Sequence, residues 1–186
     1  MKTALILIDI QNDYFPSGKG ELENPIAAAT QASKLLDFFR QQKWPTVHIQ
    51  HVAIRPGAIT FLPETEGVKI HPSVAPLVGE TVIVKHFPNS FRETNLLEHL
   101  KRLEVGCLVL CGMMTHMCVE AGMRAATDFG YPVLLAADAC ATRALSYGET
   151  TVPAAYVQAA CLAALKSYGQ VLKTKEILEL LKGPGL

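Results

Sequence analysis

This sequence has no excess of either charge, because its 17 lysines and arginines match its 17 aspartates and glutamates. A neutral composition gives no support for nucleic acid or an anionic membrane surface as a partner. The sequence also has no apolar run near the ~18 residues of a membrane span, and the apolar start at residues 4–8 is too short for a secretory signal. These absences predict a cytoplasmic protein that binds neither nucleic acid nor membrane.

Cysteine spacings typical of a metal site are also missing. The five cysteines are an odd number, which suits reduced thiols in a reducing compartment. No internal repeat and no linker divides the chain, so we expect one domain over residues 1–186. Only 18% of the residues are charged, which hints that some apolar surface is buried between subunits.

What the sequence does contain is a regular alternation of short apolar runs and helical patterns. We expect strands at residues 4–8, 46–51, 81–84, 107–111, 132–136 and 169–172. We expect helices at residues 25–42, 94–103, 115–129, 153–166 and 174–181. Most of the strands are apolar on both faces, and this predicts an α/β fold: a single doubly wound parallel sheet of about six strands with helices on both sides. Residues 52–80, rich in proline, are expected to form a long loop over a pocket.

Residues 105–120 combine a buried strand, a glycine break and a helix start. Gly112 ends the strand, Thr115 is a candidate helix cap, and Cys118 lies one turn inside the helix. We expect the helix dipole to favour the Cys118 thiolate, and the free N–H groups of Met114 and Cys118 to bind an oxyanion. The alternative is that a buried cysteine is only a small apolar side chain, which is our interpretation of the four other cysteines.

Two more chemical groups follow buried strands. Asp9 comes directly after residues 4–8, and Lys85 directly after residues 81–84. Taken singly, Asp9 could cap a turn and Lys85 could be solvated. The carboxyl ends of parallel strands meet at one edge of a sheet, where ligands bind, so we expect Asp9, Lys85 and Cys118 to come together. Asp9 would then accept the thiol proton, while Lys85 keeps Asp9 ionised.

The motifs around these three residues resemble the isochorismatase-like cysteine hydrolase superfamily. They read DIQNDYF at residues 9–15, KHFPNSF at residues 85–91 and GMMTHMCV at residues 112–119, and the last is closest in wording to streptothricin-hydrolase-like and uncharacterised members. The resemblance implies an Asp–Lys–Cys triad, a cis peptide bond between Met113 and Met114, and a homodimer or larger homo-oligomer.

Nicotinamidases of this superfamily carry a metal beside the triad, held by an acid and histidines after the second strand. Here His48 and His51 are three residues apart on a strand and should face opposite sides, and no aspartate occurs between Asp37 and Asp128. We therefore predict no metal and no cofactor.

The predicted activity is hydrolysis of a C–N bond in a small amide, carbamoyl compound or lactam through a thioester on Cys118. Two alternatives are hydrolysis of a vinyl ether, which needs no thiol, and a non-catalytic role in which Cys118 senses oxidants. The substrate itself is not determined by these residues. The candidate substrate-binding residues are Phe15, His51, Phe87, Phe91 and Thr115.

Overall fold

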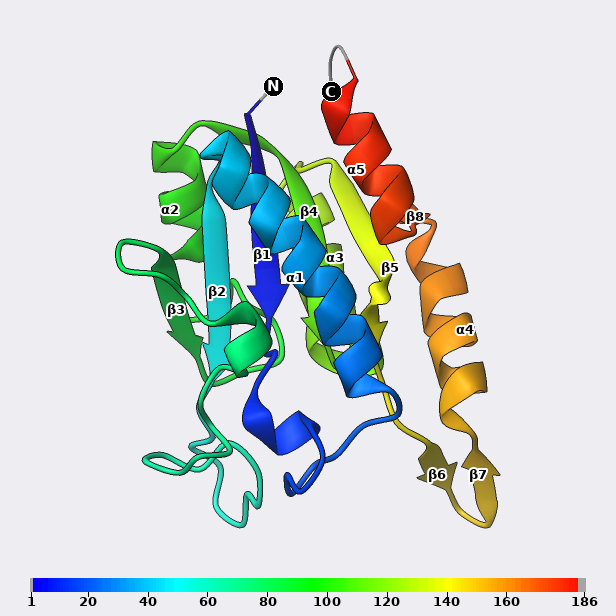
Figure 1. Cartoon of the computed structure of the whole chain (residues 1–186). Coiled ribbons are helices and arrows are strands. Elements are labelled where there is room, and N and C mark those ends of the chain that lie inside the picture. Colours follow the sequence, from blue (N-terminus) through cyan, green and yellow to red (C-terminus); the bar gives the residue numbers. More distant parts are fainter. Residues whose placement is uncertain (1, 184–186) are drawn as a thin grey trace.

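A six-stranded sheet runs through the computed structural model, which describes residues 2–183 (Figure 1). Every pair of neighbouring strands in it is parallel. Their order across the sheet is β3 (Thr81–Lys85), β2 (Thr46–His51), β1 (Lys2–Ile8), β4 (Val105–Met113), β5 (Val133–Ala141) and β8 (Gln170–Leu172). From β1 the chain first builds outward to β3 and then returns to β4, so the direction of winding reverses between β1 and β4. The predicted doubly wound parallel sheet is confirmed.

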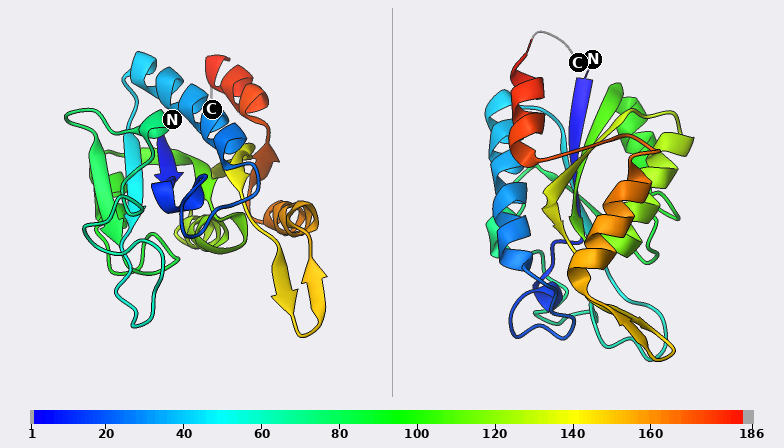
Figure 2. Two further views of the ribbon diagram at one scale, coloured as in Figure 1. Left: turned by 60° about the horizontal axis from the view of Figure 1, so that its bottom comes forward. Right: turned by 90° about the vertical axis from the view of Figure 1, so that its right-hand side faces the viewer.

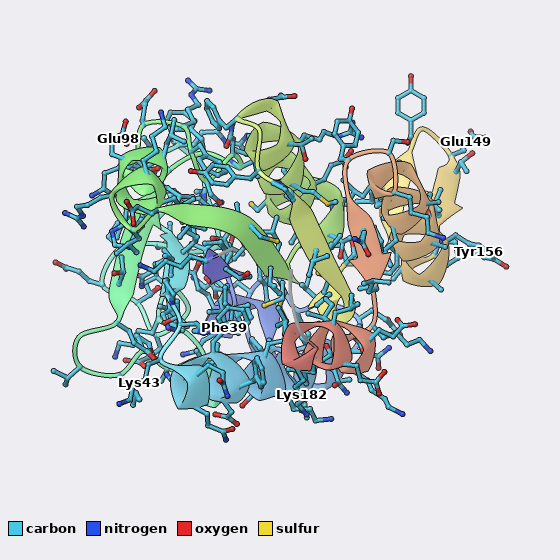
Figure 3. All side chains as sticks on the ribbon, turned by 90° about the horizontal axis from the view of Figure 1, so that it is seen from above. Phe39, Lys43, Glu98, Glu149, Tyr156 and Lys182 are labelled. Carbon is cyan, nitrogen blue, oxygen red and sulfur yellow. The ribbon has the colours of Figure 1, made fainter. Side chains whose placement is uncertain are left out.

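Helices cover both faces of the sheet, and each face has its own apolar core (Figure 2). On one face lie α1 (Pro25–Gln42) and α5 (Thr174–Lys182). On the other lie α2 (Leu96–Arg102), α3 (Glu120–Asp128) and α4 (Ala154–Leu165). Phe39 of α1 is fully buried against the sheet, and Figure 3 shows it from above. No helix of residues 2–183 is long and apolar enough to cross a membrane.

The segment expected to be one helix at residues 115–129 is two elements. A π-helix over Thr115–Val119 precedes α3. Thr115 does not cap this helix, because the cap position is Met114 and the Thr115 hydroxyl instead donates to the Ala141 carbonyl oxygen at 3.1 Å. The expected cap was wrong because the Thr115 side chain is buried toward β5, where it satisfies a carbonyl group of that strand.

Two further differences lie at the carboxyl side of the sheet. Strand β5 was expected to end at Ala136 but continues to Ala141, because a register shift against β4 lets pairing resume at Cys140. A two-stranded hairpin then follows, β6 (Leu145–Tyr147) and β7 (Thr150–Val152), which the sequence patterns had not indicated.

Candidate active site

Asp9 lies directly after β1, beside the point where the winding of the sheet reverses. Its backbone has φ of 51°, a left-handed conformation that aspartate tolerates better than most residues. Its N–H group donates to the Ile49 carbonyl oxygen of β2 at 3.1 Å, and the residue is fully buried. The strand end therefore places a carboxylate at the ligand-binding edge of the sheet.

Lys85 forms an ion pair with Asp9 from two strands away. Its Nζ atom lies 2.7 Å from Asp9 Oδ2, and neither side chain is exposed. The same ammonium donates to the carbonyl oxygens of Phe87 and Pro88, both at 3.1 Å. Asp9 Oδ1 has no hydrogen-bond partner within residues 2–183, although it is buried. A buried carboxylate oxygen without a partner is uncommon and is available to accept a proton.

Cys118 lies in the π-helix that follows the cis Met113–Met114 peptide bond. Burial and the charge of Asp9 raise the pKa of the Cys118 thiol, and the opposing effect of Lys85 is smaller. Burial by itself lowers the pKa of Lys85, but the Asp9 carboxylate and the Cys118 sulfur outweigh it and raise that pKa. This direction opposes the expected preference for thiolate, because Cys118 is only 6% exposed and lies beside the Asp9 carboxylate, and both effects disfavour a charged sulfur.

Gly112 allows β4 to approach the end of β1 closely. Its φ is +136°, and a Cβ atom at this position would lie 2.0 Å from the Ile8 carbonyl oxygen. Only glycine adopts this conformation without strain and leaves that space empty. The close approach brings the start of the π-helix beside Asp9.

Gln11 was not singled out from the sequence, yet its buried side chain ties three segments together. The amide nitrogen donates to the carbonyl oxygens of His51 at 2.9 Å and Val68 at 2.7 Å, and the amide oxygen accepts from the His51 N–H group at 2.7 Å. Asp13 also holds residues 52–80, because its carboxylate accepts from the Phe61 N–H group at 2.5 Å. The loop therefore packs on the segment after β1 of its own chain.

The predicted substrate-binding residues do not all face one space. Phe15 is buried and stacks on His71, with ring centroids 3.6 Å apart, and His51 lies edge-on to Phe61 at 5.6 Å. Burial lowers the pKa of His51, and its buried Nδ1 atom has no hydrogen-bond partner in the described part of the chain. The rings of Phe15 and His51 therefore both pack against the loop of residues 52–80.

Phe87 and Phe91 belong to the loop that follows Lys85. The Arg92 guanidinium lies 3.7 Å above the Phe87 ring, and Phe91 packs on Phe129 with centroids 5.2 Å apart. Phe91 also packs against the apolar core cluster that contains Cys118.

Cavities open at this edge of the sheet, but not onto the three catalytic candidates. One of about 390 Å³ is lined by residues including Asn12 and Lys19. Another of about 370 Å³ lies between α1 and α4, with Thr142 and Gln158 in its wall. Neither is lined by Asp9, Lys85 or Cys118, so neither of the two joins the three catalytic candidates to the pocket that residues 52–80 were expected to cover.

The two histidines considered as metal ligands have different environments. His48 is buried, with Nε2 3.0 Å from Glu80 Oε2, whereas His51 lies at the carboxyl end of β2 beside Gln11. Within residues 2–183, no group of three or more histidine, cysteine, aspartate or glutamate side chains is arranged to hold a metal ion. The absence of a catalytic metal stays a prediction.

Comparison with known proteins agrees with this fold and with the motifs around the site. The isochorismatase domain model matches residues 3–175. The isochorismatase family protein YddQ of Bacillus subtilis is 51% identical over 176 residues, which cover 95% of this chain and 98% of that protein. A crystal structure from Oleispira antarctica, assigned to the isochorismatase hydrolases, superimposes with a TM-score of 0.91 at 48% identity and covers 96% of both chains.

Streptothricin hydrolase of Streptomyces noursei is 33% identical over 155 residues, which cover 82% of this chain and 55% of that enzyme. The chain belongs to the isochorismatase family of hydrolases. The resemblance inferred from the three motifs is confirmed at the level of the family.

Proposed function

We propose that this protein hydrolyses a C–N bond of a small amide, carbamoyl compound or lactam, with Cys118 as nucleophile and without a metal. The observation that carries the proposal is the buried Lys85–Asp9 ion pair, 2.7 Å long, beside the Cys118 thiol. A buried carboxylate kept ionised by a lysine is a base, and a thiol whose pKa is raised needs one. The name of the relative streptothricin hydrolase supports a hydrolytic reaction.

In the proposed reaction, Asp9 Oδ1 accepts the proton of Cys118 while Sγ attacks the carbonyl carbon of the amide. The N–H groups of Met114 and Cys118 bind the oxyanion of the tetrahedral intermediate. Protonated Asp9 then gives its proton to the departing nitrogen, leaving an acyl group on Cys118. Water then attacks the thioester and gives a proton to Asp9. The C–S bond breaks, the acid product leaves, and Asp9 returns the proton to Cys118 Sγ. Lys85 stabilises the negative charge of the Asp9 carboxylate before each of the two attacks, by the thiol and by water.

Intact-protein mass spectrometry after incubation with a panel of small amides tests this proposal. We expect a covalent acyl adduct and released amine with the wild type, and no adduct with Cys118→Ala. Cys161→Ala removes another, half-buried cysteine and is the matched control, which should keep both signals. An amide whose hydrolysis survives in Cys118→Ala contradicts the proposed nucleophile.

The same variant separates amide cleavage from hydrolysis of a vinyl ether. Ether cleavage by acid catalysis needs no thiol, so it should continue in Cys118→Ala and stop in Asp9→Asn. Turnover of a vinyl ether by Cys118→Ala, with no amide turned over by the wild type, would replace the proposed activity.

A further inference from the structure

Tyr14 is a buried polar residue that the proposed reaction does not use. It ends a short 3₁₀ helix, η1 (Asn12–Tyr14), which follows Asp9 at the carboxyl end of β1 (Figure 1). The residue is only 4% exposed. Its N–H group donates to the Gln11 carbonyl oxygen at 3.0 Å, and its carbonyl oxygen accepts from the Leu22 N–H group at 3.1 Å. The backbone of Tyr14 is therefore held through both of its polar groups.

The ring of Tyr14 is held by Phe61 from the loop of residues 52–80. The two rings meet edge to face, with centroids 4.8 Å apart and planes at 89°. Phe61 is itself fixed, because its N–H group donates to the Asp13 carboxylate at 2.5 Å and its carbonyl oxygen accepts from the Ala53 N–H group at 2.9 Å. Because both the backbone and the ring are held, the Tyr14 hydroxyl group has a fixed position.

The Tyr14 hydroxyl group lies within electrostatic reach of the catalytic candidates. Burial raises the pKa of Tyr14 well above its usual value, and the charges of Cys118 and Asp9 raise it further. Arg143, an exposed residue after β5, has the opposite and smaller effect on this pKa. A phenol with a raised pKa keeps its proton at neutral pH, so Tyr14 is a neutral hydrogen-bond donor.

This donor has no acceptor of its own. The Tyr14 hydroxyl group makes no hydrogen bond within residues 2–183, although a buried tyrosine normally has a partner there. Tyr14 also belongs to the same apolar core cluster as Met114, whose N–H group is a candidate oxyanion donor. A fixed, unpaired donor beside a nucleophile and its oxyanion site is available to a bound substrate.

We propose that Tyr14 determines substrate specificity: its hydroxyl group donates a hydrogen bond to an acceptor atom next to the carbonyl group that Cys118 attacks. Because it rests on the proposed amide hydrolysis, this role narrows the substrates to amides with an oxo group or a ring nitrogen beside the reacting carbonyl. An amide with only hydrocarbon at that position leaves the buried hydroxyl unpaired. The cost of an unpaired buried donor makes such an amide a poor substrate.

Two pairs of neutral primary amides test this role, with ammonia release as the assay. Pyruvamide and pyridine-2-carboxamide have an acceptor beside the carboxamide, whereas methacrylamide and benzamide have similar shapes with carbon in its place. The wild type should hydrolyse each acceptor-bearing amide with a kcat/KM at least about 10-fold above that of its partner. Tyr14→Phe removes only the hydroxyl group and should abolish most of this preference in both pairs.

A comparison within pairs separates a hydrogen bond to the substrate from a structural role. A Tyr14→Phe protein with a disturbed site would lose activity equally for both members of a pair, and such a loss overturns the inference. An unchanged preference overturns it too. Tyr131→Phe is the matched control, because Tyr131 is a half-buried tyrosine directly before β5, at the amino edge of the sheet, and its removal should leave the preference intact.

The wild-type rates distinguish failure of this role from failure of the proposed function. A wild type that hydrolyses methacrylamide and benzamide as fast as their partners is still an amide hydrolase, but its specificity does not come from Tyr14. A wild type that hydrolyses none of the four amides also overturns the inference. In that case the acyl adduct on Cys118, sought by mass spectrometry with the wider panel, decides separately whether amide hydrolysis stands.

Discussion

Lys85 and Asp9 make an ion pair across the width of β2, with Nζ and Oδ2 2.7 Å apart and neither side chain exposed. Removing one partner leaves an uncompensated buried charge, so Asp9→Asn and Lys85→Met should each cost about 3–5 kcal/mol in the free energy of unfolding. The double variant should lose less than the sum, by more than ~1 kcal/mol.

Urea denaturation of the four proteins measures this coupling. The exposed Lys175–Glu179 pair, 3.9 Å apart, is the control, and its removal should change the free energy of unfolding by no more than about 0.5 kcal/mol. Additive losses from Asp9→Asn and Lys85→Met would mean that the two charges do not stabilise one another.

The pH dependence of Cys118 alkylation should report its raised pKa. Burial and Asp9 raise that pKa, so the rate with iodoacetamide should be low at neutral pH and rise steeply in alkaline solution. Asp9→Asn removes the second cause and should make alkylation faster at a given pH while abolishing amide hydrolysis. If Asp9→Asn were inactive and also slower to alkylate, Asp9 would not be a group that raises the pKa of the Cys118 thiol.

Stability between about pH 4.5 and pH 2 should depend on Glu80. Its carboxylate accepts two hydrogen bonds from Arg40, at 2.7 and 2.8 Å, which with further bonds from Leu77 and His48 lower its pKa from 4.5 to about 2. A carboxylate with a depressed pKa stabilises the fold above its unfolded-state pKa and loses that contribution as the pH falls.

Glu80→Gln should therefore be less stable than the wild type by about 1–2 kcal/mol at pH 7, a figure discounted for partial solvent access. The two proteins should converge as the pH approaches 2, measured by thermal unfolding across that range. Glu179→Gln, on an exposed helix position, should show no such convergence. A difference in stability between Glu80→Gln and the wild type that stays constant at every pH would show that the loss comes from changed packing and not from the charge of Glu80.

Gly112 should tolerate no side chain. Gly112→Ala puts a Cβ atom 2.0 Å from the Ile8 carbonyl oxygen at φ of +136°, so we expect a loss of more than ~3 kcal/mol. Gly79→Ala is the matched control, because Gly79 also has a positive φ, +92°, with nothing within 4 Å of the added atom. That variant should lose only about 1–2 kcal/mol, the cost of the backbone conformation. Equal losses in the two variants would exclude the close contact as the cause.

Gln11 should control how firmly residues 52–80 are held. Gln11→Ala removes three hydrogen bonds and leaves buried backbone groups of His51 and Val68 with fewer partners, so the loop should be cleaved faster in limited proteolysis. Gln50→Ala removes only one bond, to the Val68 carbonyl oxygen, and should have a smaller effect. Equal cleavage rates for the wild type and Gln11→Ala would show that other contacts hold the loop.

The sequence by itself determined the class of the fold and the three candidate catalytic residues. Apolar runs that alternate with helical patterns specify a parallel sheet, and polar residues that directly follow such runs lie at its carboxyl edge. For this reason the sequence predicts that Asp9 and Lys85 come together, and their ion pair confirms it.

Only the tertiary structure decided the direction in which the pKa of Cys118 is shifted, the role of Thr115 and the connections of Gln11. Each depends on groups far away in the chain: Asp9 for the thiol, Ala141 for the hydroxyl, and His51 and Val68 for the amide. Patterns of neighbouring residues cannot predict such partners. The desolvation of a sulfur and the pairing of a buried polar group arise only when distant segments of the chain pack together.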